Sequence, residues 1–260
     1  MAHGVLQFPE SVASSPGRDD SFIAAVADEF PNILVRQILP PEAPPTTPHL
    51  TLASISSQLA LSSLRADFEV RFYGEYLEDI SRGLGYVERK MGAILRGLQS
   101  VDLAPSTVGL IATLNFSLKD REEEPTSHLL KQHLEGIDVD SDDVQDAVAR
   151  VAVRVRDTYY VTLTLSNYET RVWQSPLMTP GMGPIRIRPW DGVLEDVGLE
   201  LAIDINNNLE ARVSDSEPVV TEAGINAVAR ILEDIATSTG PEFAESGRLS
   251  VEQLTASSQL

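Results

Sequence analysis

The chain has 260 residues, 42% of them apolar, which is enough to bury a sizeable hydrophobic core. It contains no cysteine, so disulfide scaffolds, thiolate catalysis and thiolate metal sites are excluded. The formal net charge of −19 disfavours nucleic acid as a partner and favours a protein with a basic surface.

The N-terminal part of the chain is predicted to begin with a flexible segment over residues 1–18. Apolar residues then recur at helical spacing over residues 22–30, behind a cap at Asp19 or Asp20. Pro31 cannot continue a helix, so we expect this first helix to end there.

A strand, a linker, a second strand and a long helix are expected next. Residues 32–39 read as a strand, and residues 40–48 hold five prolines in nine residues, which is typical of a linker. Apolar and charged residues alternate over residues 64–72, which predicts a half-buried strand. Three-four spacing over residues 77–98 then predicts a long helix with one apolar stripe, buried against its own sheet in preference to a partner helix.

Four glycines interrupt this predicted helix, at Gly83, Gly85, Gly92 and Gly97. Each costs about 1 kcal/mol relative to alanine in a helix interior. We therefore expect that packing holds the helix, or that a glycine admits a close neighbour, and the first two glycines also permit a kink.

The C-terminal half is predicted to be mostly strand. Alternating apolar residues indicate strands over residues 108–118, 149–156, 159–172 and 197–205. A closing helix follows Thr221 and is expected to stop at Gly240 and Pro241, before a disordered tail over residues 239–260.

Strands joined by tight turns, with helices that do not alternate regularly, predict an α+β fold. We expect antiparallel, meandering strands packed against the long central helix and the C-terminal helix. The domain is either a single unit over residues 19–238 or two intimately packed halves, 19–118 and 125–238.

The compartment is expected to be the cytoplasm. The first ten residues lack the basic and apolar regions of a secretory signal, and no apolar run approaches the roughly 20 residues that span a bilayer. A membrane partner is therefore not predicted.

The negative charge is concentrated in two segments. Residues 120–146 hold ten acids against two bases, and residues 191–245 hold thirteen acids against two bases. These contribute −8 and −11, which together account for the net −19. Because the rest of the chain is balanced, the acidity belongs to particular surfaces, which favours a basic protein partner.

No motif of hydrolases, nucleotide-binding proteins or dinucleotide-binding proteins occurs in the sequence. The strongest metal candidates are Asp138, Asp140 and Asp142, because alternate carboxylates suit a hard cation. An EF-hand loop starting at Asp138 would need glycine and glutamate where the chain has Asp143 and Ala149. A solvated acidic loop is therefore favoured, and no metal or cofactor is predicted.

The best candidate for partner binding is the long segment between the predicted strands over residues 159–172 and 197–205. It holds both tryptophans and a small basic cluster in an otherwise acidic chain. Tryptophan, arginine and methionine are enriched at interface hot spots. The predicted partner-binding residues are Trp173, Met182, Arg186, Arg188 and Trp190. In the alternative interpretation, the tryptophans anchor the core and the arginines pair with nearby acids.

The order of elements resembles a sporadically distributed family of uncharacterised bacterial proteins of about 260 residues. The similarity lies in Val108-Gly109-Leu110-Ile111 and in the aliphatic strand from Leu199 to Ile205, with Asp204 embedded in it. That resemblance implies no activity and no catalytic residues.

Two functional hypotheses remain open from the sequence. The first is a non-catalytic protein-binding factor of the adaptor, chaperone-like or antitoxin-like neutralising kind, which uses the acidic surfaces and the Trp/Arg segment. The alternative is an enzyme with a dispersed acidic site that depends on a divalent cation. The sequence favours the first, and leaves open whether the chain forms a homo-oligomer.

Overall fold

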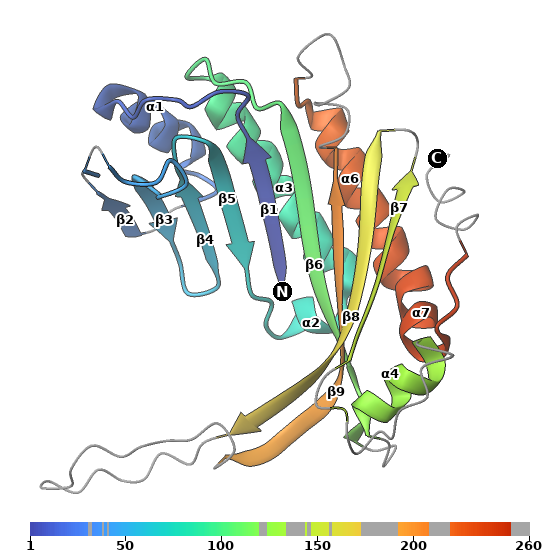
Figure 1. Cartoon of the computed structure of the whole chain (residues 1–260). Coiled ribbons are helices and arrows are strands. Elements are labelled where there is room, and N and C mark those ends of the chain that lie inside the picture. Colours follow the sequence, from blue (N-terminus) through green and yellow to red (C-terminus); the bar gives the residue numbers. More distant parts are fainter. Residues whose placement is uncertain are drawn as a thin grey trace, which may run out of the picture.

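The described part of the computed structural model forms one antiparallel sheet of nine strands (Figure 1). It describes residues 1–30, 33–37, 39–40, 42–119, 124–133, 144, 147–155, 158–172, 192–207 and 219–250. The strands are β1 (Ala2–Gln7), β2 (Ile33–Arg36), β3 (Leu50–Ala53), β4 (Ser57–Leu61), β5 (Arg65–Val70), β6 (Thr107–Ser117), β7 (Val148–Val155), β8 (Tyr159–Val172) and β9 (Val193–Asn206). Their order across the sheet is β2-β3-β4-β5-β1-β6-β9-β8-β7.

The helices lie on one face of this sheet, behind it in Figure 1. They are α1 (Pro16–Val26), α2 (Glu75–Glu78), α3 (Ile80–Gln99), α4 (Pro125–His133), α6 (Glu222–Asp234), the π-helical turn η4 (Ile235–Thr239) and α7 (Gly240–Ser246). The predicted α+β class, with antiparallel strands against a long helix and a C-terminal helix, is confirmed.

The hydrophobic core lies between the sheet and the helices α3 and α6, which pack side by side. The buried side of α3 carries Met91, Leu95 and Leu98, each 0% exposed. Removing such a side chain from water contributes about 1.5–3 kcal/mol. The side chain of Thr221 caps α6 by accepting a hydrogen bond from Gly224 N at 3.2 Å, as expected for a helix that begins after a threonine.

The sheet has a symmetrical arrangement of the two halves of the chain. The central strands β1 and β6 are flanked by β5 and β9, then by β4 and β8, and then by β3 and β7. Because β1 from the start of the chain pairs with β5 and with β6, the sheet runs without interruption through both halves.

The prediction that residues 1–18 are flexible is wrong. Residues 2–7 form the central strand β1, and α1 begins at Pro16, three residues before the predicted cap. The strand lacked a clear apolar pattern because its buried face includes small residues. At Gly4 an added Cβ would lie 2.4 Å from Met91 Sδ, so the strand and α3 approach too closely for a larger side chain.

The predicted helix over residues 77–98 is two helices. The break is at Asp79, not at the glycines, because the extended backbone of Asp79 (φ −126°) ends α2 and its side chain caps α3. Asp79 Oδ1 accepts from Arg82 N at 3.0 Å. Leu77 therefore lies on the short helix α2, outside the buried stripe of α3.

The predicted stop at Gly240 and Pro241 is also wrong. The chain continues through η4 into α7, and Pro241 lies in the first turn of α7. Backbone N–H groups in the first turn of a helix have no acceptor within the helix, so the missing N–H of proline breaks no hydrogen bond there. Phe243 is 3% exposed, so α7 belongs to the core and not to a disordered tail. Residues 251–260 lie outside the described residues.

Candidate functional site

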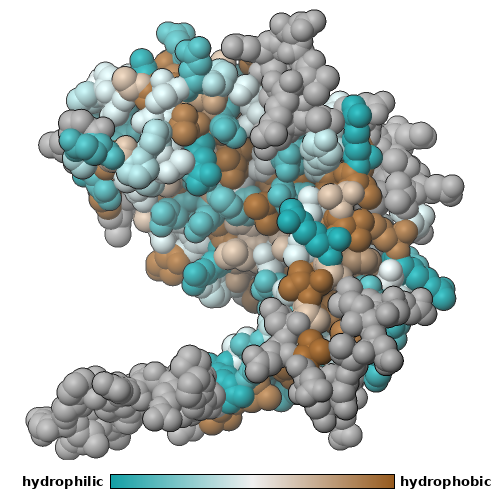
Figure 2. All heavy atoms as spheres, viewed as in Figure 1, coloured by the Kyte–Doolittle hydropathy of each residue, from teal (hydrophilic) through white to brown (hydrophobic). Residues whose placement is uncertain are grey.

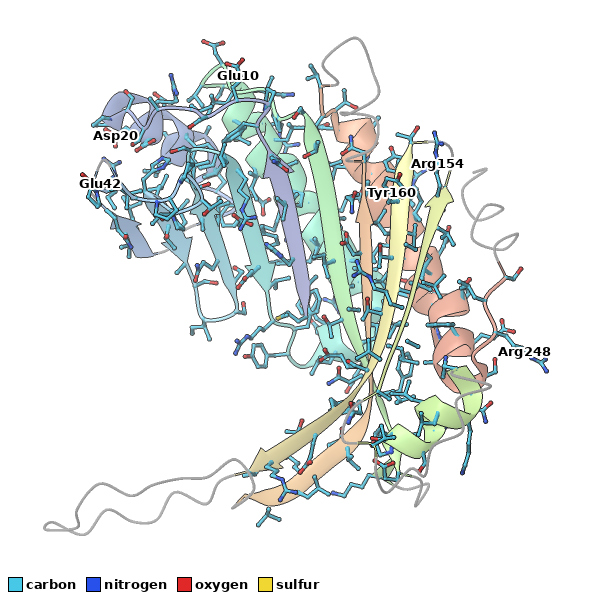
Figure 3. All side chains as sticks on the ribbon, viewed as in Figure 1. Glu10, Asp20, Glu42, Arg154, Tyr160 and Arg248 are labelled. Atoms are coloured by element: carbon cyan, nitrogen blue, oxygen red, sulfur yellow. The ribbon has the colours of Figure 1, made fainter. Side chains whose placement is uncertain are left out.

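The face of the sheet opposite the helices carries mostly polar side chains (Figure 3). In Figure 3, Arg154 of β7 and Tyr160 of β8 mark one end of this open face, and the two residues are partners in the register. Residues at alternate positions of β9, among them Glu200 and Asp204, belong to the same face and are half-buried. Antiparallel sheets commonly present one such polar face.

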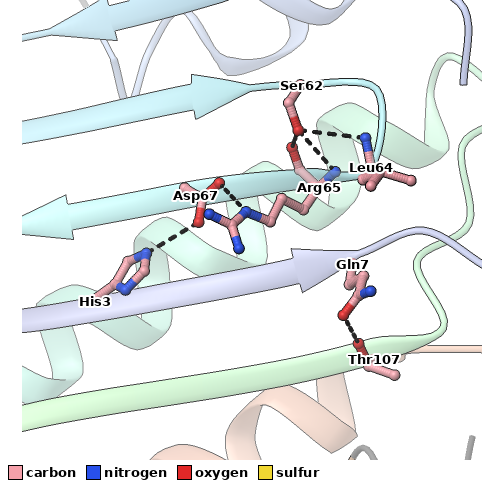
Figure 4. A network of polar contacts seen from close by, with 7 residues as sticks. All are labelled: His3, Gln7, Ser62, Leu64, Arg65, Asp67 and Thr107. Carbon is pink, nitrogen blue, oxygen red and sulfur yellow. Dashed lines mark hydrogen bonds and ion pairs between the residues drawn. The ribbon is translucent and has the colours of Figure 1, made fainter. Parts of the chain in front are cut away.

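A polar network on this face holds β1 between its neighbours (Figure 4). His3 Nε2 lies 3.2 Å from Asp67 Oδ1, and Arg65 Nε donates to Asp67 Oδ2 at 2.8 Å. At the other end of β1, Thr107 contacts the side chain of Gln7 at 3.5 Å. No serine or threonine hydroxyl is bonded to His3 among the described residues, so this network joins strands and does not form a nucleophile-base pair.

A largely apolar pocket of about 460 Å³ opens where β1 begins. Its lining combines Met1 just before β1, the far half of β6, helix α2 and the first turns of α3, with single residues of β9, η4 and α7. The lining residues are Met1, Phe72, Tyr76, Leu77, Ile80, Gly83, Leu84, Ala112, Thr113, Leu114, Asn115, Phe116, Glu200, Ala236 and Pro241. This volume is in the range of sites that bind small molecules or single side chains of a partner.

Aromatic and aliphatic side chains form one wall of the pocket. Phe72 stacks on Tyr76 with ring centroids 6.5 Å apart, and Tyr76 meets Tyr86 edge-on at 5.7 Å. The guanidinium of Arg82 lies 5.2 Å above the Tyr76 ring. Leu77 is 64% exposed beside them, which leaves an apolar side chain available for contact.

Among the described strands, none pairs with β6 beyond Thr113 on the side of β1, beside this pocket. On that side β1 pairs with β6 only as far as Met1, whose carbonyl accepts from Thr113 N at 2.9 Å. Within the described residues, no strand lies next to Asn115 and Ser117 on this edge. Exposed strand edges of this kind are templates for pairing with another chain.

Positively and negatively charged groups both lie at the mouth of the pocket. The Met1 ammonium donates to Thr113 O at 3.3 Å. Burial lowers the pKa of the Met1 amino group below its usual value, and the Glu200 carboxylate offsets part of this lowering. Glu75 of α2 accepts from Arg82 at 2.8 Å on the exposed rim.

A second polar cluster lies where β8 and β9 extend beyond β6 as a two-stranded arm, at the bottom of Figure 1. Ser117 Oγ donates to Asp196 Oδ1 at 2.6 Å, and Tyr168 OH donates to Asp196 Oδ2 at 2.5 Å. These hydrogen bonds, from Ser117 first and Tyr168 second, lower the pKa of Asp196. Burial and the bond to Asp196 raise the pKa of the Tyr168 phenol.

The arm is partly apolar at its described end. Val172 and Val193 are 43% and 64% exposed, and Leu194 is 39% exposed. Figure 2 shows brown, apolar surface near the place where the arm leaves the body of the molecule. The pocket lies at the same end of the sheet, since its lining residues Phe116 and Glu200 lie close to the base of the arm.

The partner-binding residues predicted from the sequence, Trp173, Met182, Arg186, Arg188 and Trp190, lie outside the described residues. The structure places only the strands that lead into them. The metal candidates Asp138, Asp140 and Asp142 also lie outside that part of the chain. Where side chains are described, no group of three or more acids and histidines is arranged to hold a metal ion. Among the described helices, none is long and apolar enough to cross a membrane.

The pocket and the unpaired edge were not predicted from the sequence. The only signal was the apolar residue Leu77, which the pattern assigned to the buried stripe of a single helix. Its exposure follows from the break at Asp79.

No family model matches this chain, and a search of curated proteins found no relative. The function is therefore argued from the site.

Proposed function

We propose that this protein is a non-catalytic factor that binds another protein, in the manner of an adaptor, a chaperone or a neutralising factor. The observation that carries the proposal is the largely apolar pocket of about 460 Å³, which has Leu77, 64% exposed, among its lining residues. A largely apolar cavity beside an exposed leucine suits an apolar side chain of a polypeptide better than it suits a polar metabolite.

The charge of the chain supports a basic partner. The net charge is −19, and Glu200, one of the residues that line the pocket, lies on strand β9 opposite Asn115 of β6. Electrostatic attraction of this kind accelerates association and selects against acidic partners more than it adds affinity.

The test compares two exposed aliphatic residues that differ in position. Leu77 lines the pocket and is 64% exposed, whereas Ile55, in the β3–β4 turn, is 101% exposed and is not a lining residue. The full chain is tagged in its native host, and the proteins recovered with wild type, Leu77→Glu and Ile55→Glu are quantified by mass spectrometry. Both substitutions are at exposed sites and should change the free energy of unfolding by no more than about 0.5 kcal/mol.

We expect Leu77→Glu to lower recovery of a stoichiometric partner by roughly tenfold or more, since an apolar side chain buried in an interface contributes about 1.5–3 kcal/mol. Ile55→Glu should leave recovery within about twofold, because charge at a site outside the interface has little effect. Equal recovery with both variants would show that the pocket is not the binding site.

A further inference from the structure

We propose that helix α7 is a pH-sensitive clasp, which His128 and His133 of α4 hold against the body of the protein and which is released when His133 is protonated. Because α7 forms part of the pocket wall, its release would open the pocket. The inference rests on the proposed function and adds a regulation of the same site. It predicts that the partner protein is held at neutral pH and released in acid.

The pocket depends on the position of α7. Ala236 of the π-helical turn η4 and Pro241 of α7 are among the lining residues. The chain approaches the sheet closely between them, since an added Cβ at Gly240 would lie 3.0 Å from Leu201 Cδ2 of β9. Movement of α7 away from the sheet would therefore remove part of the pocket wall.

Two imidazoles of α4 hold the C-terminal end of α7, beside it in Figure 1. His128 Nε2 lies 3.2 Å from Ala244 O, and His133 Nε2 lies 3.3 Å from the same oxygen. In a continuing α-helix this carbonyl would accept from Arg248 N, but that group donates to Ser246 Oγ instead. The last carbonyls of a helix need donors from outside it, and α4 supplies two.

These contacts define the protonation state of His133. A carbonyl oxygen can only accept, so Nε2 carries the proton in the neutral ring. The other nitrogen, Nδ1, is buried and has no hydrogen-bond partner in the part of the chain that the structure describes. Gly247 lies over it, since an added Cβ there would be 3.4 Å from Nδ1. A second proton on His133 would therefore create a buried N–H group without an acceptor, which is unfavourable.

A protonated His133 would also lie close to a second histidine. The ring centroids of His128 and His133 are 6.2 Å apart, and Phe243 of α7 covers the His133 ring edge-on at 5.1 Å. Burial is the largest influence on the pKa of His133 and lowers it. The bond to Ala244 O opposes this lowering, and the charge of His128 adds to it. The docked form of α7 thus favours the neutral ring.

The remaining ionisable groups near the two helices lie at the surface or at helix ends. Among the described residues, Lys131 of α4, Glu242 and Glu245 of α7, Arg248 after α7 and Glu169 of β8 are exposed, and Glu233 and Asp234 at the end of α6 are half-buried. Strands β8 and β9 present buried apolar residues to these helices. No carboxylate is among the causes that shift the pKa of His133. The clasp therefore lacks a counter-ion that would favour the charged ring.

The segment before α7 can serve as a hinge. In η4 the α-helical bonding pattern is interrupted, because Gly240 N donates to Ile235 O, five residues back. Helices bend at such turns. Phe243 is the one large side chain that α7 buries, so the docking of α7 depends on few contacts besides the clasp.

The sign of the pH dependence follows from the two states of α7. When α7 is released, His133 becomes exposed and titrates near the ordinary pKa of about 6.5. When α7 is docked, the pKa of His133 is lower. Docking is therefore complete above about pH 6.5 and weakens as the pH falls, by up to about tenfold per pH unit until the lowered pKa is reached.

The test measures amide hydrogen exchange by mass spectrometry on the full chain at about pH 7.5 and about pH 5.5. Rates are converted to protection factors, which removes the intrinsic pH dependence of exchange. His133→Gln is the decisive variant, because its amide keeps an N–H donor for Ala244 O and does not titrate. His3→Gln is the matched control, since His3 pairs with Asp67 on the open face and is not a lining residue.

We expect the protection of residues 240–247 in wild type to fall by about tenfold or more between the two pH values. Residues 199–205 of β9 should keep theirs. In His133→Gln the protection of α7 should change by less than about twofold, and His3→Gln should behave like wild type. Recovery of the partner from the native host should fall in acid for wild type and His3→Gln, but not for His133→Gln.

Unchanged protection of α7 in wild-type protein would overturn the clasp, and so would an equal loss in His133→Gln. If that variant does not fold, an NMR titration of the His133 ring in wild type decides, because its midpoint must match the loss of protection. Loss of protection with unchanged partner recovery would refute the regulation of the pocket. The proposed function is tested separately, since it fails only if Leu77→Glu leaves recovery unchanged.

Discussion

Alanine substitutions of two glycines in the same helix should change stability in opposite directions. At Gly85 an added Cβ would meet nothing within 4 Å, whereas at Gly97 it would lie 2.6 Å from Val26 Cγ1 and 3.1 Å from Phe22 Cε2. Val26 and Phe22 belong to α1 and are each 1% exposed. The close approach of α1 to α3 therefore depends on Gly97.

The magnitudes follow from two competing effects. Gly→Ala in a helix interior stabilises by about 1 kcal/mol, through helix propensity. Adding a methyl group to a well-packed contact destabilises by about 1–3 kcal/mol. Only propensity acts at Gly85, so we expect Gly85→Ala to be more stable by about 1 kcal/mol. At Gly97 the packing cost opposes the gain in propensity, and we expect a net loss of up to about 2 kcal/mol.

Urea denaturation followed by circular dichroism measures both changes in the free energy of unfolding. Thermal unfolding should give Tm shifts of about 2–4 °C per kcal/mol, upward for Gly85→Ala and downward for Gly97→Ala. If Gly97→Ala were stabilised as much as Gly85→Ala, α1 would not pack against α3 at this point and the assignment of the glycine to a helix contact would be refuted.

Three ionisable side chains, Tyr168, His133 and Glu29, give further predictions. Burial and Asp196 raise the pKa of Tyr168 above 10.0, so the protonated phenol stabilises the fold fully below pH 10, and this contribution is lost as the pH rises through the raised pKa. Asp196→Asn should lower the titration midpoint of Tyr168, measured from tyrosinate absorbance. Burial lowers the pKa of His133 below 6.5, so the neutral imidazole contributes fully to the free energy of unfolding above pH 6.5, and this contribution is lost as the pH falls through the lowered pKa. In His133→Gln, the Tm should therefore depend less on pH in this range. Glu29→Gln removes the carboxylate 3.1 Å from Lys90 Nζ and should cost about 1.5–3 kcal/mol in urea denaturation, much of it recovered when Lys90→Met is added.

Strands in which apolar residues recur with a clear period could be predicted from the sequence. Residues 64–72 and 197–205 alternate over most of their length, and the corresponding strands β5 and β9 bury Phe68, Leu201 and Ile203 as the pattern requires. A pattern of period two places these residues on one face whatever the neighbours are. The α+β class followed from the tight turns between such strands.

Strand β1 could not be predicted, because its buried face includes small residues. Strand β1 buries Ala2 and Gly4, which carry little hydrophobic signal, and its place in the sheet is fixed by pairing with β5 and β6, about sixty to one hundred and ten residues away in the chain. The continuation of α6 into α7 was missed for a different reason. Pro241 reads as a stop, but its place in the first turn of α7 needs no hydrogen-bond donor.

The sequence by itself determined composition, charge segregation and the local periods, because each depends only on the order of the residues. Tertiary structure alone decided which segments meet at the pocket, where Asn115 of β6 lies with Leu77 and Tyr76 of α2. These side chains come from segments about forty residues apart, and only long-range strand pairing brings them to one site. A local pattern carries no information about such pairing, since the free energy that fixes it comes from contacts between distant segments.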